Sequence, residues 1–330
     1  MKNFAARLLL LAMAMATSGC AGVQSALMPS GEEAIEVDLL FWTITGISAF
    51  VTGLVVVLVA VAMYGTPRWR ARLDRDWIVW GGGIVFPVAV LTGVFIYGLI
   101  VLRSGDLRAR EAEAPGITVV GKRWWWEVVY TGPDGEPVTT ANELRIPAGR
   151  PIAIRLESDN VIHSFWVPRL AGKLDMIPGR SNVLTLEATE PGLSRGQCAE
   201  YCGGAHALMA FYVEVLPEEE YDDWLAHEAS DARPPESEQE IRGQEVFMRN
   251  GCGACHSIRG TKANGVIGPD LTHLGSRHSL AAAALPNGKA AIAAWIVENQ
   301  HIKPDNLMPE YRIFEPEELN AVAAYLESLE

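Results

Sequence analysis

The sequence predicts a multidomain membrane protein, in which a two-helix transmembrane hairpin precedes a β-sandwich and a small all-α domain. Three observations predict this fold class. Two long stretches near the amino terminus contain no charged residue. A central region alternates apolar and polar residues between turn signals, and the carboxyl-terminal region has apolar residues at helical spacing. The hydrophobic content of 49% is therefore concentrated in particular segments.

Residues 1–19 have the pattern of a secretory signal peptide. Lys2 and Arg7 precede an apolar run at Leu8–Ala16, and small residues then lead to Cys20. Small residues before a cysteine also resemble a bacterial lipoprotein cleavage site, so we expect Cys20 to be lipidated. The alternative is ordinary signal cleavage, which would leave an idle thiol.

Residues 39–64 and 77–102 are the two predicted transmembrane helices. Each would be about 39 Å long, enough to cross a hydrocarbon core of about 30 Å. A buried soluble helix is the alternative, but it would be apolar on one side rather than all round. The loop between them contains four arginines, and acidic residues precede the first. We therefore expect a protein of the bacterial cytoplasmic membrane, with a cytoplasmic loop and with both termini and the soluble domains on the periplasmic or outer side.

Two soluble domains follow the hairpin. Residues 113–229 are the predicted sandwich, with alternation over 152–156 and a turn at Gly132–Gly135. Residues 230–237 are an acidic, proline-containing linker, and residues 238–330 form the helical domain. The net charge of −13 argues against nucleic acid as a partner, because phosphates require a basic surface.

A cluster of soft metal ligands lies near the end of the sandwich domain. It contains Cys198, Cys202, His206 and Met209. Thiolate and imidazole ligands suit zinc or copper, and the added thioether favours copper. A disulfide between the two cysteines is the alternative, but a disulfide would require neither the imidazole nor the thioether. The cluster therefore indicates electron transfer.

The sequence Cys252-Gly-Ala-Cys255-His256 has the spacing at which a c-type haem is covalently attached. A zinc site would need a second pair of ligands at similar spacing. Met308 is the preferred sixth iron ligand, since a thioether is a common axial ligand in such proteins. We expect a backbone carbonyl of Gly268–Leu271 to orient His256. The rival sixth ligands are His273, His278 and His301.

Several of these segments resemble a known family. Residues 196–209 resemble the dinuclear copper A loop of cytochrome c oxidase subunit II, and residues 161–168 resemble the segment that supplies the other histidine of that site. Residues 173–182 continue the match, so the resemblance covers about residues 1–229. The remainder resembles a class I cytochrome c fused at the carboxyl terminus, as in caa-type haem-copper oxidases. The resemblance implies a cupredoxin-like sandwich and an all-α class I cytochrome c domain.

The resemblance also implies roles for individual residues. Two bridging thiolates, two capping imidazoles, a weak thioether ligand and a backbone carbonyl would hold the copper pair: Cys198, Cys202, His163, His206, Met209 and Glu200. The Glu200 side chain would reach a Mg or Mn ion shared with subunit I. Electrons would enter the copper site through Trp124. The alternative for this ring is a place in the sandwich core or at the membrane interface.

The sequence departs from the family pattern at three places. Arg123 stands where glutamine is usual, and Asn160 stands where aspartate is usual. A tethered donor relaxes the need for such a docking charge, because tethering raises the local concentration. The second transmembrane segment lacks the acid that passes protons to subunit I in the family, and Asp76 is the nearby carboxylate.

The expected function is that of a subunit of a terminal cytochrome c oxidase, an oxidoreductase. Electrons would pass from a cytochrome c donor through the covalent haem and the copper pair to haem in subunit I, where oxygen is reduced; subunit III is a further expected partner. The alternatives are the same relay in a copper A nitric oxide reductase, and a periplasmic copper-delivery or thiol-redox protein. Nitrous oxide reductase also carries such a copper site, but it is a soluble enzyme with a large propeller domain, and the predicted membrane helices weigh against it.

Overall fold

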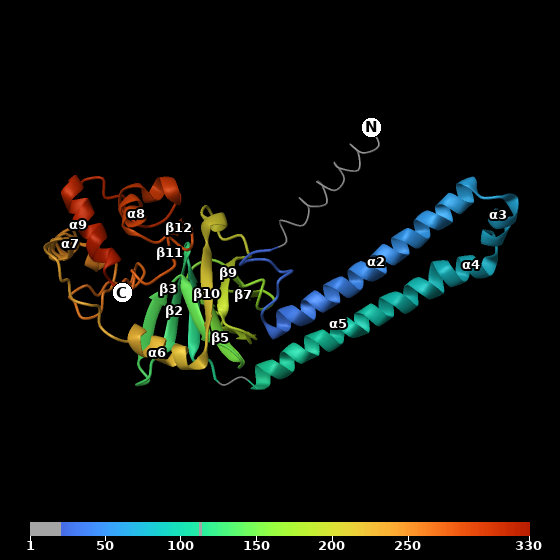
Figure 1. Ribbon diagram of the computed structural model, residues 1–330, viewed down its shortest axis with the longest axis horizontal. Helices are drawn as coiled ribbons and strands as arrows, with labels where there is room; N and C mark the ends of the chain where they lie inside the picture. The colour runs from blue at the N-terminus through green and yellow to red at the C-terminus, as the bar shows by residue number, and fades with distance from the viewer. Residues whose placement is uncertain (1–20, 112–113) are drawn as a thin grey trace, which may run out of the picture.

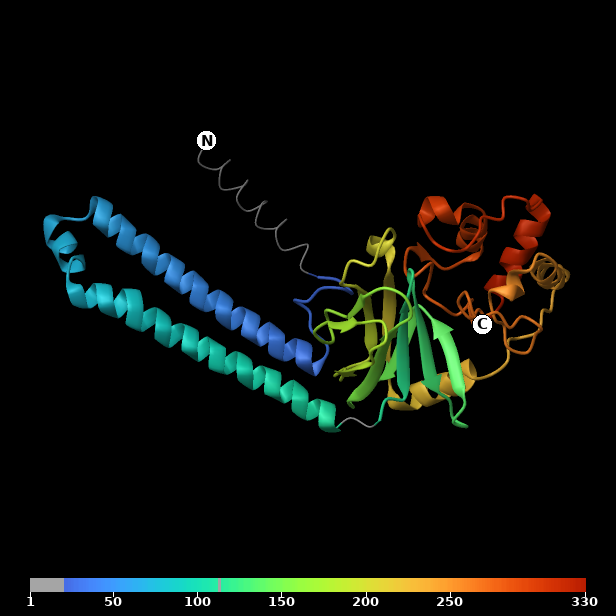
Figure 2. The same ribbon diagram turned by 180° about the vertical axis from the view of Figure 1, so that it is seen from behind.

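The computed structural model describes residues 21–111 and 114–330 (Figure 1). Three parts lie in a row, with the helical hairpin on one side of the sandwich and the small helical domain on the other (Figures 1 and 2). This order confirms the predicted fold class. The predicted signal peptide and Cys20 lie outside the described residues.

Two long antiparallel helices form the hairpin. Its elements are α2 (Glu32–Tyr64), α3 (Pro67–Leu73), α4 (Asp76–Trp80), the π-helical turn η1 (Gly81–Val85) and α5 (Phe86–Glu111). The helices extend beyond the predicted spans 39–64 and 77–102, because charged residues at helix ends do not break a helix. Glu32 and Glu33 even favour the first turn of α2, where the helix dipole is positive. Both helices have an apolar window of mean hydropathy 2.5, long enough to cross a membrane.

The start of α2 is attached to the sandwich. The amide of Gly31 donates to the Arg169 carbonyl at 3.1 Å, and the amide of Glu32 donates to the Glu187 carbonyl at 3.0 Å. The carboxylate of Glu33 accepts a hydrogen bond from Gly172 N at 3.2 Å. These contacts satisfy amides that have no partner within the helix, and they fix the point at which the hairpin leaves the sandwich.

The sandwich consists of two five-stranded sheets, with strand orders β3-β2-β1-β5-β8 and β4-β10-β9-β6-β7. The strands are β1 (Ile117–Lys122), β2 (Trp125–Thr131), β3 (Pro137–Ala141), β4 (Glu143–Pro147), β5 (Ile152–Ser158), β6 (His163–Trp166), β7 (Leu174–Met176), β8 (Asn182–Leu186), β9 (Gly192–Cys198) and β10 (Ala210–Leu216). Alternate residues of β1 and β2 are buried, which is the period of a strand with one face on the core. Trp126, Phe165 and Phe211 form the aromatic centre between the sheets.

Helix α6 (Glu218–Glu228) closes one end of the sandwich, and the helical domain follows. Its elements are α7 (Glu238–Arg249), the 3-10 turn η3 (Cys252–Ala254), the short hairpin of β11 (Ser279–Leu280) and β12 (Leu285–Pro286), α8 (Lys289–Ile302) and α9 (Pro316–Glu327). Ser237 and Glu240 form a capping box that starts α7. Helices α7 and α9 cross closely at Gly243, where a Cβ would overlap the Ala321 carbonyl. The domain core lies between these helices.

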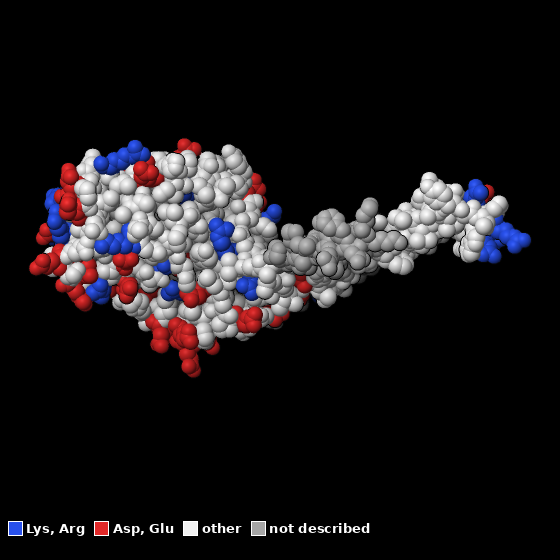
Figure 3. Space-filling model, turned by 45° about the horizontal axis from the view of Figure 1, so that its top comes forward, with Lys and Arg blue, Asp and Glu red and all other residues white. Residues whose placement is uncertain are grey.

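Charge is distributed unevenly along the molecule. Figure 3 shows Lys and Arg side chains gathered at the far tip of the hairpin, whereas Asp and Glu are scattered over the soluble domains. The tip is the region of α3, whose arginines are Arg68, Arg70 and Arg72.

Candidate copper and haem centres

The soft ligands of the sandwich lie at or next to the termini of three strands. Strand β9 ends at Cys198, β10 begins one residue after Met209, and β6 begins at His163. The Cys198 amide donates to the Met209 carbonyl at 2.9 Å and closes the intervening loop. Strands β6, β9 and β10 are neighbours in one sheet. Residues that are distant in sequence therefore come together at one end of these strands.

The donor atoms lie at short distances from one another. Cys198 Sγ lies 3.7 Å from Cys202 Sγ and 3.7 Å from His163 Nδ1. Cys202 Sγ lies 3.5 Å from His206 Nδ1 and 3.8 Å from Met209 Sδ. Each thiol therefore has its own imidazole, and the two thiols face each other. This arrangement fits two soft metal ions held by a shared pair of sulfurs.

A backbone oxygen and the charge state of the thiols also suit this group of residues to metal binding. The Glu200 carbonyl lies 3.2 Å from Cys198 Sγ, while the Glu200 side chain is exposed. The hydrogen bond from the Cys202 thiol, with that of His163, lowers the pKa of Cys198 well below its ordinary value. The pair therefore readily holds a thiolate, which is the form that binds metal.

His163 is held from two sides. A Cβ on Gly121 would come within 2.7 Å of the imidazole, so only glycine leaves room for the ring. His163 Nε2 donates to Asn160 Oδ1 at 3.4 Å, which leaves Nδ1 directed at Cys198. Sequence reasoning placed Asn160 on a docking surface and missed this contact, which is the kind that orients a metal-binding imidazole.

Trp124 packs directly on the copper loop. Its indole Nε1 donates to the Cys202 carbonyl at 2.9 Å, and its ring lies against Gly203, where a Cβ would approach Cζ2 to 2.9 Å. The residue is only 7% exposed, and its carbonyl accepts a hydrogen bond from Lys303 of the helical domain. Trp124 is therefore part of the contact between the two soluble domains.

The haem motif lines an apolar cavity in the helical domain, which we call the haem domain from here on. Cys252, Cys255 and His256 share its wall with Met308. The His256 imidazole donates from Nδ1 to the Pro269 carbonyl at 2.8 Å, within the Gly268–Leu271 loop expected to orient it. Burial lowers the pKa of His256 and favours the neutral ring that ligates iron. These residues fit a covalently attached haem.

The candidates for sixth ligand have different surroundings. Met308 faces the same cavity as His256. His273 instead directs Nδ1 to the Glu330 carbonyl and Nε2 to the Ser230 carbonyl. His278 Nε2 contacts the Glu214 carboxylate at 3.2 Å, and His301 is exposed. The placement favours Met308, and its role as ligand stays a prediction.

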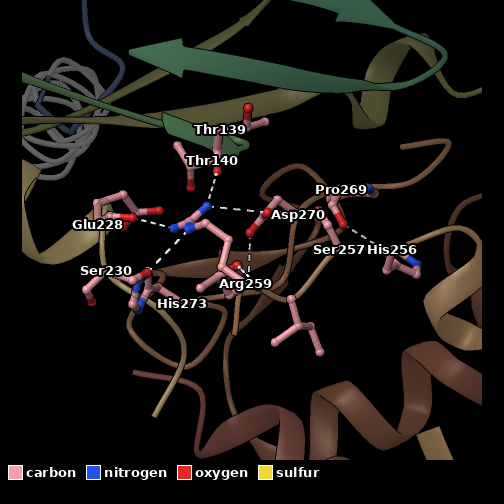
Figure 4. Close-up of polar contacts among 12 residues, drawn as sticks. Thr139, Thr140, Glu228, Ser230, His256, Ser257, Arg259, Pro269, Asp270 and His273 are labelled. Carbon is pink, nitrogen blue, oxygen red and sulfur yellow. Dashed lines mark hydrogen bonds and ion pairs between the residues drawn. The ribbon is translucent and has the colours of Figure 1, made fainter. Parts of the chain in front are cut away.

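Arg259 connects the haem-binding loop to the sandwich (Figure 4). Its guanidinium donates to the Thr139 carbonyl of β3 at 3.2 Å, to the Ser230 carbonyl at 3.3 Å and to the Glu228 carbonyl. It also contacts Asp270 Oδ2 at 3.4 Å. Asp270 follows Pro269, so the loop that orients His256 is attached to β3.

Lys303 is a second interdomain residue that sequence reasoning missed. It follows α8 and is 2% exposed. Its ammonium lies among the backbone carbonyls of Trp124, Leu208 and Ala281. Burial lowers the pKa of Lys303 to about 7, while the nearby Cys202 raises it. A single lysine in a polar stretch carries no sequence signal that would distinguish it from a surface residue.

Comparison with known proteins gives two family matches. Residues 134–216 match the family described as cytochrome c oxidase subunit II, periplasmic domain, and residues 241–330 match the cytochrome c family. The first match implies a copper A centre and the second implies a haem. Among solved structures, the periplasmic domain of subunit II of cytochrome oxidase of Bradyrhizobium japonicum is similar, with 30% identity and a TM-score of 0.32 over 34% of this chain and 90% of that chain.

Two curated relatives extend over most of the chain. Cytochrome c oxidase subunit 2 of Alkalihalophilus pseudofirmus is 38% identical over 246 residues, which cover 74% of this chain and 69% of the relative. Cytochrome c oxidase subunit 2 of Bacillus sp. (strain PS3) is 27% identical over 268 residues, covering 78% and 74%. With the convergent copper ligands and the haem cavity, these matches show that the chain belongs to the cytochrome c oxidase subunit II family and carries a fused cytochrome c domain.

Proposed function

We propose that this subunit relays electrons from a cytochrome c donor, through its carboxyl-terminal domain and then its sandwich domain, to haem in subunit I. The observation that carries the proposal is the contact of Trp124 with both centres: it lines the haem cavity and donates to the Cys202 carbonyl. When bound, a haem and a dinuclear copper centre each take up and release one electron. The oxidase role itself follows from family membership; the route is the proposal.

The residues divide into two ligand sets. Cys252 and Cys255 would attach the haem, and His256 and Met308 would ligate its iron. The copper pair would be held by Cys198, Cys202, His163, His206, Met209 and the Glu200 carbonyl. The distances among the sulfur and imidazole atoms support this assignment, and Trp124 is the proposed point at which electrons enter the copper site.

Further partners and the sidedness belong to the same proposal. The exposed Glu200 carboxylate would hold a Mg or Mn ion together with subunit I, because such hard cations prefer oxygen ligands. Subunit III would complete the complex. The arginine-rich tip of the hairpin supports a cytoplasmic location for the loop, which places both termini and both soluble domains outside. We retain the domain bounds 113–229 and 238–330, a signal peptide at 1–19 and lipidation of Cys20.

A Cys198→Ser variant of the purified complex tests the relay. Native complex should contain two copper ions and one covalent haem per chain and should consume oxygen with a reduced cytochrome donor. The variant should keep its haem, and the donor should still reduce that haem, but copper content and oxygen uptake should both be lost because a bridging sulfur is gone.

Three outcomes would contradict the proposal. Normal oxygen uptake by a copper-free Cys198→Ser complex would show that electrons bypass the sandwich domain. Consumption of nitric oxide in preference to oxygen by the native complex would indicate a copper A nitric oxide reductase. One weakly bound copper ion per chain, lost to mild chelation, would indicate a copper-delivery protein.

A further inference from the structure

Lys303 occupies the junction of the two soluble domains. A lysine this deeply buried is rare unless its charge is paired or solvated by polar groups. Here Nζ donates to Trp124 O at 2.6 Å, to Leu208 O at 2.9 Å and to Ala281 O at 2.8 Å. An ammonium has three donors, so all of them are used on backbone carbonyls.

The three carbonyls belong to three segments that have different tasks. Trp124 lies in the turn between β1 and β2, Leu208 lies in the copper loop beside Met209, and Ala281 lies in the β11–β12 hairpin of the haem domain. One side chain of the haem domain therefore bonds at once to the backbone of Trp124, to the copper loop and to the wall of the haem cavity.

Trp124 is consequently held at both ends. Its indole donates to the Cys202 carbonyl, and its own carbonyl accepts from Lys303. Trp124, Ala281 and Lys303 also line the cavity that contains His256. A continuous series of hydrogen bonds thus joins the copper loop to the haem cavity, and Lys303 is the member that crosses the domain boundary.

Neighbouring contacts show that the junction is closely fitted. Ala282 is fully buried in the core of the sandwich, although it belongs to the haem domain, and its carbonyl accepts a hydrogen bond from Ala210 N at 3.1 Å. A Cβ on Gly204 in the copper loop would overlap the Asp305 carboxylate. Tethering alone would supply a high local concentration but no fixed orientation.

We propose that Lys303 is a positioning residue for electron transfer from the haem domain to the copper site. Its ammonium holds the Trp124 backbone, the copper loop and the haem cavity wall in fixed positions relative to one another. Without this ammonium, three buried carbonyls at the junction have no hydrogen-bond donor, which is energetically costly. The domains then shift or separate. The inference rests on the proposed relay and assigns to it a residue outside both ligand sets.

The test is a Lys303→Met variant of the full complex, because methionine keeps much of the length of lysine and cannot donate. Two measurements are made. Amide hydrogen exchange reports the junction through the segments that contain Ala210 and Ala281, and it does not depend on activity. Flash reduction of the haem then gives the rate of haem-to-copper transfer.

The expected result has three parts. Exchange becomes faster in both segments, and transfer becomes several-fold slower, because electron-transfer rates fall as the separation between donor and acceptor increases. Copper content, haem content, their spectra and their reduction potentials remain those of the native complex. Lys262→Met is the matched control: it removes the same charge from an exposed site of the same domain, and it should change neither measurement.

Other outcomes overturn the inference in distinguishable ways. Native exchange and a native transfer rate in Lys303→Met would show that the ammonium positions nothing. Loss of copper from this variant would show that Lys303 supports the copper site itself rather than the register of the domains. If the native complex shows no haem-to-copper transfer, the relay is wrong, and the positioning role falls with it even if exchange changes as expected.

Discussion

At the scale of single residues, glycines leave space for the rings that lie at the copper loop and at the haem cavity. Gly203 has φ of +117° and lies against the indole of Trp124. Gly121 leaves space for the imidazole of His163, and Gly268 does the same for His256, where a Cβ would approach Cε1 to 2.6 Å. A side chain at any of these positions would displace a ring with a proposed function, because the neighbouring atoms are in rigid contact.

The assignment of Met308 can be tested directly. A Met308→Ala variant should bind carbon monoxide when reduced, because removal of the thioether opens the sixth position of the iron. The measurement is the difference spectrum of the reduced complex with and without carbon monoxide. Copper content should be unchanged, since Met308 contacts no copper ligand in the described structure.

Met248→Ala is the matched control for this variant. Met248 is partly buried and packs against the core of the haem domain, so its removal reduces packing without changing iron ligation. If Met308→Ala fails to bind carbon monoxide, Met308 is not the ligand, and another side chain must hold the sixth position.

At the scale of elements, two arginine side chains of the helical domain bind oxygen atoms of β3 across the contact between the domains. Arg259 reaches β3, the end of α6 and the start of the linker. Arg277 donates to Thr140 Oγ1 at 3.3 Å and to Asp270 O at 2.7 Å. Arg259 thereby satisfies the Thr139 carbonyl of the edge strand β3, where a backbone group without a partner is costly.

Replacement of Arg259 by methionine should loosen this contact. Hydrogen bonds to a charged group contribute about 1.5–3 kcal/mol each, so we expect the docked arrangement to weaken by about 2 kcal/mol or more. The linker between α6 and α7 is already exposed at Glu236, but it should then become more mobile and be cleaved faster. The measurement is the rate of cleavage after Glu236 by a glutamate-specific protease.

Arg249→Met is the control, because Arg249 pairs with Glu318 on the exposed surface of the haem domain, and such pairs contribute about 0–1 kcal/mol. Equal cleavage rates in the native protein and the Arg259→Met variant would show that Arg259 does not hold the domains together.

At the scale of the whole molecule, one buried carboxyl makes the contact between the domains sensitive to pH. Glu143 of β4 is 6% exposed, and its carboxylate accepts hydrogen bonds from the His278 and Ser279 amides of the haem domain. Burial raises the pKa of Glu143 above its ordinary value of 4.5, against the lowering effect of His278 and Arg277. The charged form is therefore the costly one in the folded state.

The sign of the pH effect follows from this direction. When folding raises the pKa of a carboxyl, its contribution to folding stability is fully present at pH values below the pKa of the unfolded state. This contribution is lost as the pH rises through the pKa of the folded state. Glu143→Gln keeps an acceptor oxygen and removes the charge. The stability of this variant relative to the native protein should therefore increase as the pH rises from about 4.5 to neutral.

The measurement is the denaturation midpoint of both proteins across this range. The difference between them isolates Glu143 from the other carboxyls, which titrate equally in both. A constant difference would show that the charge of Glu143 has no cost at the contact between the domains.

Much of this protein is determined by local sequence. The two apolar helices, the turn-punctuated strands, the haem attachment motif and the soft ligands between Cys198 and Met209 are each visible within a short segment, because their chemistry depends on residue type and spacing. The family resemblance added His163 and Trp124, and the loop at Pro269 was expected from the needs of a ligating imidazole.

The tertiary structure decided how the domains meet. Lys303, Arg259 and Glu143 look like surface residues in the sequence, and Ala282 belongs to a plain alanine run, yet all four lie at the junction. Asn160 looks like a docking residue and instead contacts His163. Such contacts join residues far apart in the chain, and their energy comes from burial and from partners that only the folded arrangement supplies. For that reason the sequence determines the two centres, whereas the route between them depends on the fold.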